Sequence, residues 1–376
     1  MTTLRLPMLI FPLSFCLTFW IYMGLPLISW LISFTATALV IALTAWKLSL
    51  FLSNITQGTL DPSNKTVIIT GCDSGFGYIT ALELNEKGFN VIAGVRFING
   101  KGAKDLVDNC KYPDRINLIE IDVTRGENDL ASDLIDKVTS ILSRSGDCLW
   151  AIVNNAGLLT VGPIDWGDYQ SSVESLVNVN LLGSIKMIRI FLPLLKQSTS
   201  SLSSSAAGGG VGARIINMSS VQGKLSLPWT PVYATTKSAI VFYSNCLRLN
   251  VNRFGIKVTT ILPYKYRTPM GQTEQLIDSL DTNWKKSSQD VKSAYGDFYY
   301  QRLRQLLGKM NNSGPESGDP KEIAHKVYQC LVTPDPPNEI ICSPWCLRPL
   351  WFLVSFMPQE LIDLFFDFVE TNYLQA

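Results

Sequence analysis

The residues with the clearest chemical use are a tyrosine and a lysine four positions apart, Tyr233 and Lys237, in a segment with helical character. On a helix, this spacing puts both side chains on one face. An unperturbed tyrosine has a pKa near about 10, too high for ready proton exchange at neutral pH. A nearby ammonium favours the phenolate and lowers that pKa. The pair therefore predicts a proton donor and acceptor for an alcohol or carbonyl oxygen.

A serine precedes this pair at a useful position. Ser220 stands thirteen residues before Tyr233, just after a predicted strand at residues 214–218. Its hydroxyl can hydrogen-bond a substrate oxygen and stabilise developing charge. A structural alternative stays open, because a tyrosine and a lysine at this spacing also occur by chance, and Ser219 and Ser220 can simply end a strand.

A glycine-rich segment, TGCDSGFG at residues 70–77, follows a short β-rich run and opens a helical pattern. Such a strand–turn–helix needs glycine where the backbone turns sharply and where a pyrophosphate approaches it. The helix N-terminus then offers free N–H groups and the positive end of its dipole to the phosphates. The segment predicts a cofactor cradle, and a tight turn without a ligand is the alternative.

Short apolar runs recur between helix-length stretches. They are residues 66–70, 91–94, 116–121, 149–153, 214–218 and 257–262. Strands that alternate with helices indicate βαβ units and a parallel sheet, and continuous Val, Ile and Leu runs are typical of strands buried on both faces. We predict an α/β fold with a Rossmann-type doubly wound parallel sheet, a long helix at about residues 169–196 and a Ser/Gly loop at residues 197–212.

The composition is close to neutral and rich in apolar residues. There are 32 Lys+Arg and 31 Asp+Glu, a net charge of +1, so no basic excess exists to bind nucleic acid. Hydrophobic residues make up 47% and charged residues 17%, which excludes a disordered chain. The only histidine, His325, has no neighbouring ligand cluster and the eight cysteines form no CxxC pair, so we predict no metal site.

The N-terminal region predicts a membrane anchor. The 41 residues at 6–46 carry no charge, and residues 6–23 and 27–46 each approach the roughly 20 residues of a membrane span. Gly24 and Pro26 between them favour a helical hairpin, while one kinked span and a cleaved signal peptide are the alternatives. We expect a membrane protein, of the endoplasmic reticulum rather than of mitochondria.

Six motifs together resemble the short-chain dehydrogenase/reductase family. In chain order they are TGCDSGFG (70–77), DVT (122–124), NNAG (154–157), VNLLG (179–183), NMSS (217–220) and YATTK (233–237). The first motif, the stretch LWAIVNNAG and the apolar C-terminal tail are similar to the subgroup of retinol, 17-beta-hydroxysteroid and 3-hydroxybutyrate dehydrogenases. The resemblance spans residues 64–367 and implies an NAD(P)-dependent oxidoreductase that interconverts an alcohol and its carbonyl.

The resemblance also implies roles for single residues. The implied catalytic residues are Asn180, Ser220, Tyr233 and Lys237, with Asn180 organising a proton-relay water and Lys237 holding the nicotinamide ribose. The implied cofactor-binding residues are Gly71, Asp73, Ser74, Gly75, Phe76, Gly77, Arg96, Asp122, Val123, Asn154, Ala156, Gly157, Tyr233, Lys237, Pro263 and Thr268. Tyr264 stands where the family usually has glycine.

The choice between NAD and NADP depends on three positions. An acidic residue at the end of the second strand selects NAD through the ribose 2′-hydroxyl, but Val95 occupies that position here. Arg96 follows it and suits the 2′-phosphate of NADP. Asp73 in the glycine loop would repel that phosphate, and NAD-preferring members of the resembled subgroup carry it. We favour NAD over NADP.

Three parts are expected: an anchor at residues 1–60, a catalytic domain at 61–335 that includes a substrate lid at 268–318, and an apolar tail at 336–376 that suits membrane association. A helix is expected from Asp319. Residues 340–358 carry one charge, Arg348, and suit either core packing or a membrane-seated lip. The anchor and tail favour a lipophilic substrate, such as a steroid, sterol or retinoid.

Two other classes of function compete with this prediction. A non-catalytic NAD(P)-binding sensor or scaffold remains the alternative, because the fold can bind a nucleotide without turnover. A serine hydrolase is disfavoured, because the sequence has no GxSxG motif. The family resemblance further implies a homo-oligomer.

Overall fold

The computed structural model describes residues 58–204, 212–225, 227–313, 318–347 and 357–374, with scattered positions between residues 18 and 45. The chain divides into two units, Met1–Gly58 and Thr59–Ala376. Nearly all described residues belong to the second unit. The predicted anchor, and with it the choice between one and two spans, lies almost entirely outside the described residues.

Within the described residues, seven parallel strands form one sheet in the order β3-β2-β1-β4-β5-β6-β7. The strands are β1 (Lys65–Thr70), β2 (Asn90–Val95), β3 (Ile116–Glu120), β4 (Cys148–Asn154), β5 (Arg214–Met218), β6 (Lys257–Pro263) and β7 (Glu339–Cys342). The strand order reverses between β1 and β4, and ligands of doubly wound sheets bind at the carboxyl edge beside such a reversal. The predicted Rossmann-type fold and its six strands are confirmed.

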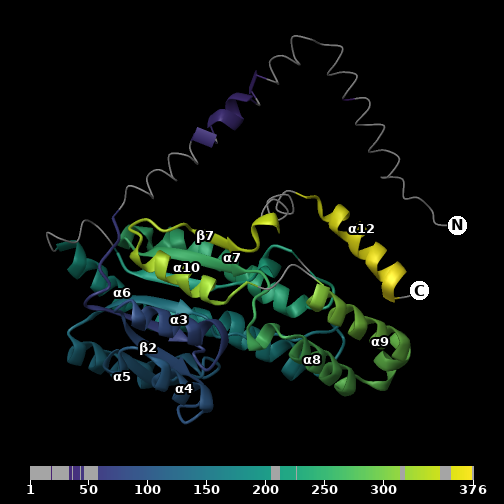
Figure 1. Cartoon of the computed structure of the whole chain (residues 1–376), viewed down its shortest axis with the longest axis horizontal. Coiled ribbons are helices and arrows are strands. Elements are labelled where there is room, and N and C mark those ends of the chain that lie inside the picture. Colours follow the sequence, from purple (N-terminus) through teal and green to yellow (C-terminus); the bar gives the residue numbers. More distant parts are fainter. Residues whose placement is uncertain are drawn as a thin grey trace. The chain divides into compact units, whose positions relative to one another are not determined.

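Helices cover both faces of the sheet (Figure 1). They are α3 (Gly75–Glu86), α4 (Lys101–Asn109), α5 (Glu127–Ser145), α6 (Ser184–Ser204), α7 (Pro231–Val251), α8 (Thr273–Lys286), α9 (Gln289–Ser313), α10 (Lys321–Val332) and α12 (Gln359–Val369). Strand side chains alternate between two cores: Val67 and Ile69 pack with α3, α4 and α10, whereas Ile68 packs with α5, α6 and α7. This alternation explains why the strands are apolar throughout.

The long helix before β5 begins with two wide turns, Gln170–Glu174 and Val177–Gly183, and continues as α6. Among the described residues, the stretch Gln170–Ser200 is the one helix long and apolar enough to cross a membrane. Its residues Met187 and Phe191 are fully buried in the second core, so it belongs to the catalytic domain. The Ser/Gly loop predicted from residue 197 is wrong up to residue 204, because α6 continues to there.

The sheet extends past residue 335, where the catalytic domain was expected to end. Strand β7 pairs with β6, with Ile340 opposite Ile261 and Cys342 opposite Pro263. The apolar character of residues 340–342 therefore reflects an edge strand, which is the core-packing alternative. The helix expected from Asp319 is α10, and Asp319 Oδ1 accepts a hydrogen bond from Lys321 N at 2.9 Å.

A third apolar cluster lies apart from the sheet, in the region of α8, α9 and α12 (Figure 1). Its buried members are Val161, Trp166, Trp229, Leu280, Trp284, Leu303 and Leu374. The cluster joins the loop after β4 to the expected lid and to the C-terminal turn Glu370–Leu374. We call it the lid cluster.

Candidate active site

The glycine loop lies at the carboxyl end of β1, beside the strand reversal. Gly71 has φ +71° and Gly75 φ +60°, in the left-handed region that favours glycine. A Cβ on Gly77 would lie 2.2 Å from Gly71 O, and a Cβ on Gly71 would lie 2.9 Å from Ala156 Cα. Helix and loop therefore pack at a distance that only glycine permits, as a pyrophosphate cradle requires.

The start of α3 is open to an anion. Ser74 is its N-cap residue, and its side chain makes no capping hydrogen bond. The first N–H groups of a helix have no partner within the helix, and they attract phosphate. Phe76 lies in the first turn, and its ring packs edge-to-face on Tyr266 with centroids 5.6 Å apart. Because this ring is packed on Tyr266, only the backbone of Phe76 can bind a phosphate. The residues at the start of α3 therefore fit a dinucleotide.

The glycine loop is held by hydrogen bonds to the residues that follow β4. Two residues of this network, Thr70 and Asn155, were not predicted from the sequence. Asn155 Nδ2 donates to Thr70 O at 2.9 Å and to Gly71 O at 3.1 Å. Thr70 Oγ1 accepts from the backbone N of Asn155 and of Ala156, both at 3.0 Å. The sequence signal for this role was the second asparagine of the NNAG motif. Its side chain holds the backbone of the glycine loop in place.

Asp73 reaches the end of β2. Both of its carboxylate oxygens accept from Arg96 N at 3.0 Å. A carboxylate thus stands at the strand end where Val95 supplies none. The Arg96 guanidinium is exposed and lies over the Phe97 ring at 5.5 Å.

The expected adenine positions differ in what they can offer. Asp122 is half-buried and its Oδ1 accepts from Thr124 N at 2.9 Å and Thr124 Oγ1 at 2.7 Å. Val123 packs against the wide turn, since a Cβ on Gly183 would lie 2.7 Å from Val123 Cγ2. Asn154 is 2% exposed and donates to Asn217 Oδ1 at 2.8 Å. Val123 and Asn154 therefore act on a nucleotide only through their backbone or through shape.

The tyrosine, the lysine and the serine of the predicted site lie close together. Tyr233 and Lys237 are buried on α7, with Lys237 Nζ 5.7 Å from the centroid of the Tyr233 ring. Ser220 is hydrogen-bonded to the Tyr233 hydroxyl. Lys237 Nζ also donates to Met218 O at 3.0 Å, which ties the helix to the end of β5.

The electrostatic expectation for this pair is corrected. Burial raises the pKa of Tyr233 above its ordinary value near 10, and the hydrogen bond with Ser220 opposes that rise only in part. Burial also lowers the pKa of Lys237 to about 8. Desolvation disfavours both charged forms, so in the protein alone the ammonium does not produce a low-pKa phenol.

Asn180 sits behind the pair, within the wide turn Val177–Gly183. Its Nδ2 donates to Leu158 O at 2.9 Å and to Thr236 Oγ1 at 3.1 Å, and its Oδ1 accepts from Leu158 N at 2.7 Å. A Cβ on Gly157 would lie 3.4 Å from Asn180 Oδ1 and 3.5 Å from Lys237 Nζ. The asparagine therefore joins the loop after β4 to α7, and Thr236 is a member of this network that sequence reasoning missed.

Pro263 ends β6, and the chain then passes the glycine loop. Tyr264 N donates to Cys342 O at 2.8 Å, which continues the pairing with β7. Among the described non-glycine residues only Asn64 has a positive φ, so Tyr264 needs no glycine-like backbone. Thr268 is buried, and its Cβ lies 3.7 Å from the position of a Cβ on Gly75. This contact brings the start of the lid to the cradle.

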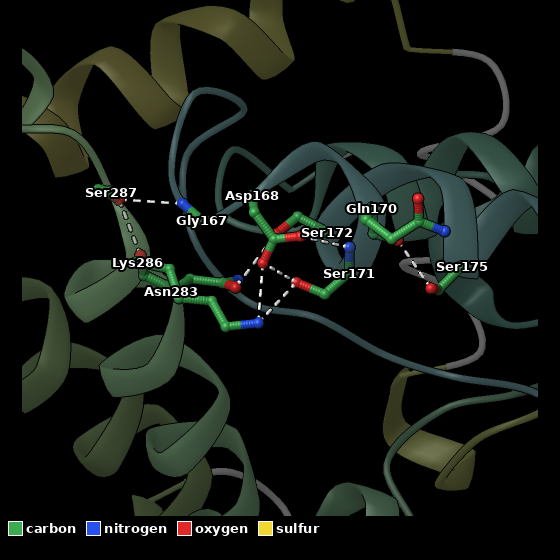
Figure 2. Close-up of polar contacts among 9 residues, drawn as sticks. All are labelled: Gly167, Asp168, Gln170, Ser171, Ser172, Ser175, Asn283, Lys286 and Ser287. Atoms are coloured by element: carbon green, nitrogen blue, oxygen red, sulfur yellow. Dashed lines mark hydrogen bonds and ion pairs between the residues drawn. The ribbon is translucent and has the colours of Figure 1, made fainter.

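The base of the lid is fastened by polar contacts to the loop before the long helix (Figure 2). Asp168 Oδ2 accepts from Lys286 Nζ at 2.8 Å and from Ser171 Oγ at 2.5 Å. Gly167 N donates to Ser287 Oγ at 2.9 Å. Hydrogen bonds from Lys286 and Ser171 hold the pKa of the Asp168 carboxyl well below its usual range.

A buried amide completes this attachment. Asn283 is 5% exposed; its Nδ2 donates to Val161 O at 2.9 Å and its Oδ1 accepts from Ser172 Oγ at 3.2 Å. Gly167 allows the close approach, because a Cβ there would lie 2.7 Å from Asn283 Oδ1. The end of α8 is thus fixed to the catalytic domain.

Comparison with known proteins agrees with this arrangement. Residues 65–276 match the family model for short chain dehydrogenases. Estradiol 17-beta-dehydrogenase 2 of Mus musculus is 30% identical over 320 residues, 84% of this chain and 77% of that protein. Retinol dehydrogenase 16 of Rattus norvegicus is 28% identical over 304 residues, 81% of this chain and 88% of that one. A short-chain dehydrogenase of Streptomyces avermitilis shares the fold, with a TM-score of 0.56 and 24% identity, covering 82% of this chain and 97% of that chain.

The site and the fold define an oxidoreductase that uses a nicotinamide dinucleotide on an alcohol or carbonyl. The chain belongs to the short-chain dehydrogenase/reductase family. The resemblance inferred from the six motifs is therefore confirmed. The similar proteins belong to the predicted subgroup, which contains steroid and retinol dehydrogenases.

Proposed function

We propose that this enzyme interconverts a hydroxyl and a carbonyl on a steroid or retinoid with NAD, using Tyr233 as the proton-transferring residue. The observation that carries the proposal is the buried phenol of Tyr233, hydrogen-bonded to Ser220 with Lys237 beside its ring. These groups stand at the carboxyl edge of the sheet next to the glycine cradle.

The bound nicotinamide supplies or takes up the hydride. Tyr233 Oη gives a proton to the oxygen during reduction and removes one during oxidation. Its raised pKa keeps the phenol protonated at neutral pH, which suits the reductive direction and makes oxidation dependent on higher pH. Ser220 donates a hydrogen bond to the same oxygen and stabilises its charge.

Lys237 and Asn180 act around the phenol. Lys237 is within reach of the space beside Gly157, where its ammonium can hold the nicotinamide ribose. Asn180 fixes Thr236 on α7 and Leu158 in the facing loop, so its side chain positions the helix that carries Tyr233. We therefore assign Asn180 a positioning role, with its side-chain groups engaged by protein partners.

The preference for NAD is supported by Asp73. Its carboxylate, held by Arg96 N at the end of β2, stands where a ribose 2′-hydroxyl is recognised and a 2′-phosphate is repelled. Gly71, Ser74, Gly75, Phe76 and Gly77 would hold the pyrophosphate. The remaining positions would flank the adenosine and nicotinamide, namely Asp122, Val123, Asn154, Ala156, Gly157, Pro263 and Thr268.

The substrate class is supported by the relatives and by the lid. The relatives are named for estradiol, 17-beta-hydroxysteroids and retinol. The lid is built around an apolar core that contains Trp166, Trp229 and Trp284. A sterol fits the same chemistry.

The proposal includes attachment of residues 1–60 to the endoplasmic reticulum membrane. Its support is the uncharged stretch of residues 6–46. Cell fractionation of the full chain tests the compartment, and sedimentation in detergent tests the expected homo-oligomer.

A turnover screen on membranes that contain the full chain tests the proposal. It compares NAD with NADP over estradiol, retinol and a short water-soluble alcohol. We expect estradiol or retinol to be oxidised with NAD and the short alcohol to be inert. Cofactor binding without turnover of any substrate would instead support a scaffold, and turnover of the short alcohol alone would reject the lipophilic substrate.

A further inference from the structure

Helix α12 has a face that is buried in the lid. Ile362, Phe366 and Val369 lie on this face, and the last two pack against the lid cluster. The Phe366 ring meets Trp229 edge-to-face, with centroids 6.2 Å apart. Trp229 lies two residues before α7 begins, so α12 rests directly on the segment that leads to the catalytic tyrosine.

A second face of α12 is apolar and exposed. Leu361 is 52% exposed, Leu364 43%, Phe365 61% and Phe368 59%. Their spacing of i, i+3, i+4 and i+7 places them in one stripe along the helix. One stripe of this kind on a soluble surface indicates an interaction site.

A third face of α12 is acidic. Glu360, Asp363 and Asp367 are exposed and follow the spacing i, i+3 and i+7. Residues 349–376 contain no lysine, arginine or histidine. The polar side of this helix therefore repels anionic groups and offers nothing to attract them.

The size and surroundings of the exposed stripe favour a lipid surface over a second protein. Four side chains on one short helix cover far less than the roughly 800 Å² per partner that a stable protein interface buries. An interfacial helix, by contrast, buries a stripe of this size at the boundary between headgroups and acyl chains. The preceding residues 349–358 (PLWFLVSFMP) are uncharged and continue the apolar sequence into α12.

We propose that α12 docks on a zwitterionic bilayer through Leu361, Leu364, Phe365 and Phe368, with its axis in the membrane plane. The face that contacts lipid is flanked on one side by the acidic face and on the other by the face that holds the lid. Docking therefore brings the lid to the membrane surface, where a lipophilic substrate is dissolved. Only this consequence for substrate delivery rests on the proposed function.

Site-specific quenching tests the docking itself and requires no enzyme activity. The full chain, with Cys16, Cys246 and Cys346 replaced by serine, receives a bimane label at Phe365→Cys or, as a matched control, at Asp363→Cys. Reconstitution in brominated phosphatidylcholine vesicles should quench the label at 365 at least about 3-fold more than the label at 363. Adding anionic phosphatidylserine should leave this ratio unchanged or lower it.

Two outcomes overturn the docking proposal. Equal quenching at both positions would show that α12 has no lipid-facing side. Protection of the 365 label from aqueous iodide, without quenching by brominated lipid, would show that a second protein copy covers the stripe. Neither outcome affects the assignment of the dehydrogenase site.

A kinetic comparison tests the consequence. Leu364→Ser/Phe368→Ser should raise the KM for estradiol or retinol in vesicles about 5-fold or more, with kcat and the KM for NAD unchanged. Asp363→Ser, at an exposed position on the acidic face, should leave all three unchanged. An unchanged KM in the double variant would show that docking of α12 does not contribute to substrate delivery.

Discussion

The cofactor edge of the sheet and the lid are held together by different kinds of contact. At the edge, backbone atoms approach so closely that a single Cβ on Gly77 would lie 2.2 Å from Gly71 O. In the lid, long side chains from α8, α9 and α12 meet in an aromatic cluster, and Gly296 interrupts α9 in open space. The cofactor edge therefore tolerates almost no substitution of its glycines. Substitutions in the lid are tolerated, at a measurable cost in stability and substrate affinity.

The largest expected effect is at the edge. Gly77→Ala should weaken NAD binding by more than about 100-fold, because the added methyl forces helix α3 away from the loop. Gly308→Ala in α9 is the matched control, since a Cβ there meets nothing within 4 Å. Isothermal titration with NAD measures both, and equal affinities would contradict the close-packed cradle.

A second prediction concerns Lys237, whose pKa is lowered to about 8 by burial. Between pH 8 and the ordinary value of 10.5, the unfolded chain binds more protons than the folded one, so stability should rise with pH across this window. The rise should be about 3 kcal/mol, at about 1.36 kcal/mol per pKa unit. Lys237→Met should lose activity and also lose this pH-dependent rise.

Urea unfolding at pH 8 and pH 10 measures that difference. If wild type and Lys237→Met show the same pH dependence, the buried amine is not the cause. Lys286→Met provides the comparison with a lysine that is exposed at the rim of the lid.

The third prediction concerns the attachment of the lid. Asn283→Ala leaves Val161 O and the Ser172 hydroxyl without their amide partner, which should cost about 3 kcal/mol. Lys286→Ala removes a partly exposed ion pair and should cost less than about 1 kcal/mol. Thermal unfolding compares the two, and the KM for the lipophilic substrate should rise in Asn283→Ala while NAD affinity stays constant.

The last prediction concerns the kink at Gly296. Its φ of 76° and ψ of 155° belong to a region that is essentially restricted to glycine. Gly296→Ala should therefore cost about 1–2 kcal/mol, whereas Gly308→Ala on the same helix should be neutral or slightly stabilising. Similar melting temperatures for the two variants would mean that the protein does not require the positive φ at residue 296.

Much of the cofactor edge could be predicted from the sequence, because local spacing determines it. The glycine spacing, the strand runs and the Tyr233–Lys237 interval each report contacts within one turn or one strand. Asn155 was missed because its partners Thr70 and Gly71 lie over 80 residues away. The pKa direction of Tyr233 was wrong because burial, which no spacing reveals, raises the pKa of this phenol.

The lid and the C-terminal region could be predicted only in outline. The sequence places residues 340–342 in an apolar tail, although the same apolar character suits an edge strand beside β6. The polar residues 197–204 suggested a loop, but they continue α6. In both segments, neighbouring elements decide the structure that the local sequence leaves open.

Transfer of deuterium from a steroid alcohol to NAD tests the central claim most directly. The full chain is incubated with NAD and estradiol deuterated at the carbinol carbon, and mass spectrometry measures deuterium in the NADH formed. We expect labelled NADH with wild type and with Tyr243→Phe, a variant of a half-buried tyrosine on the same helix, and at least a roughly 1,000-fold slower transfer with Tyr233→Phe. Equal transfer by wild type and Tyr233→Phe would contradict the proposed role of this phenol.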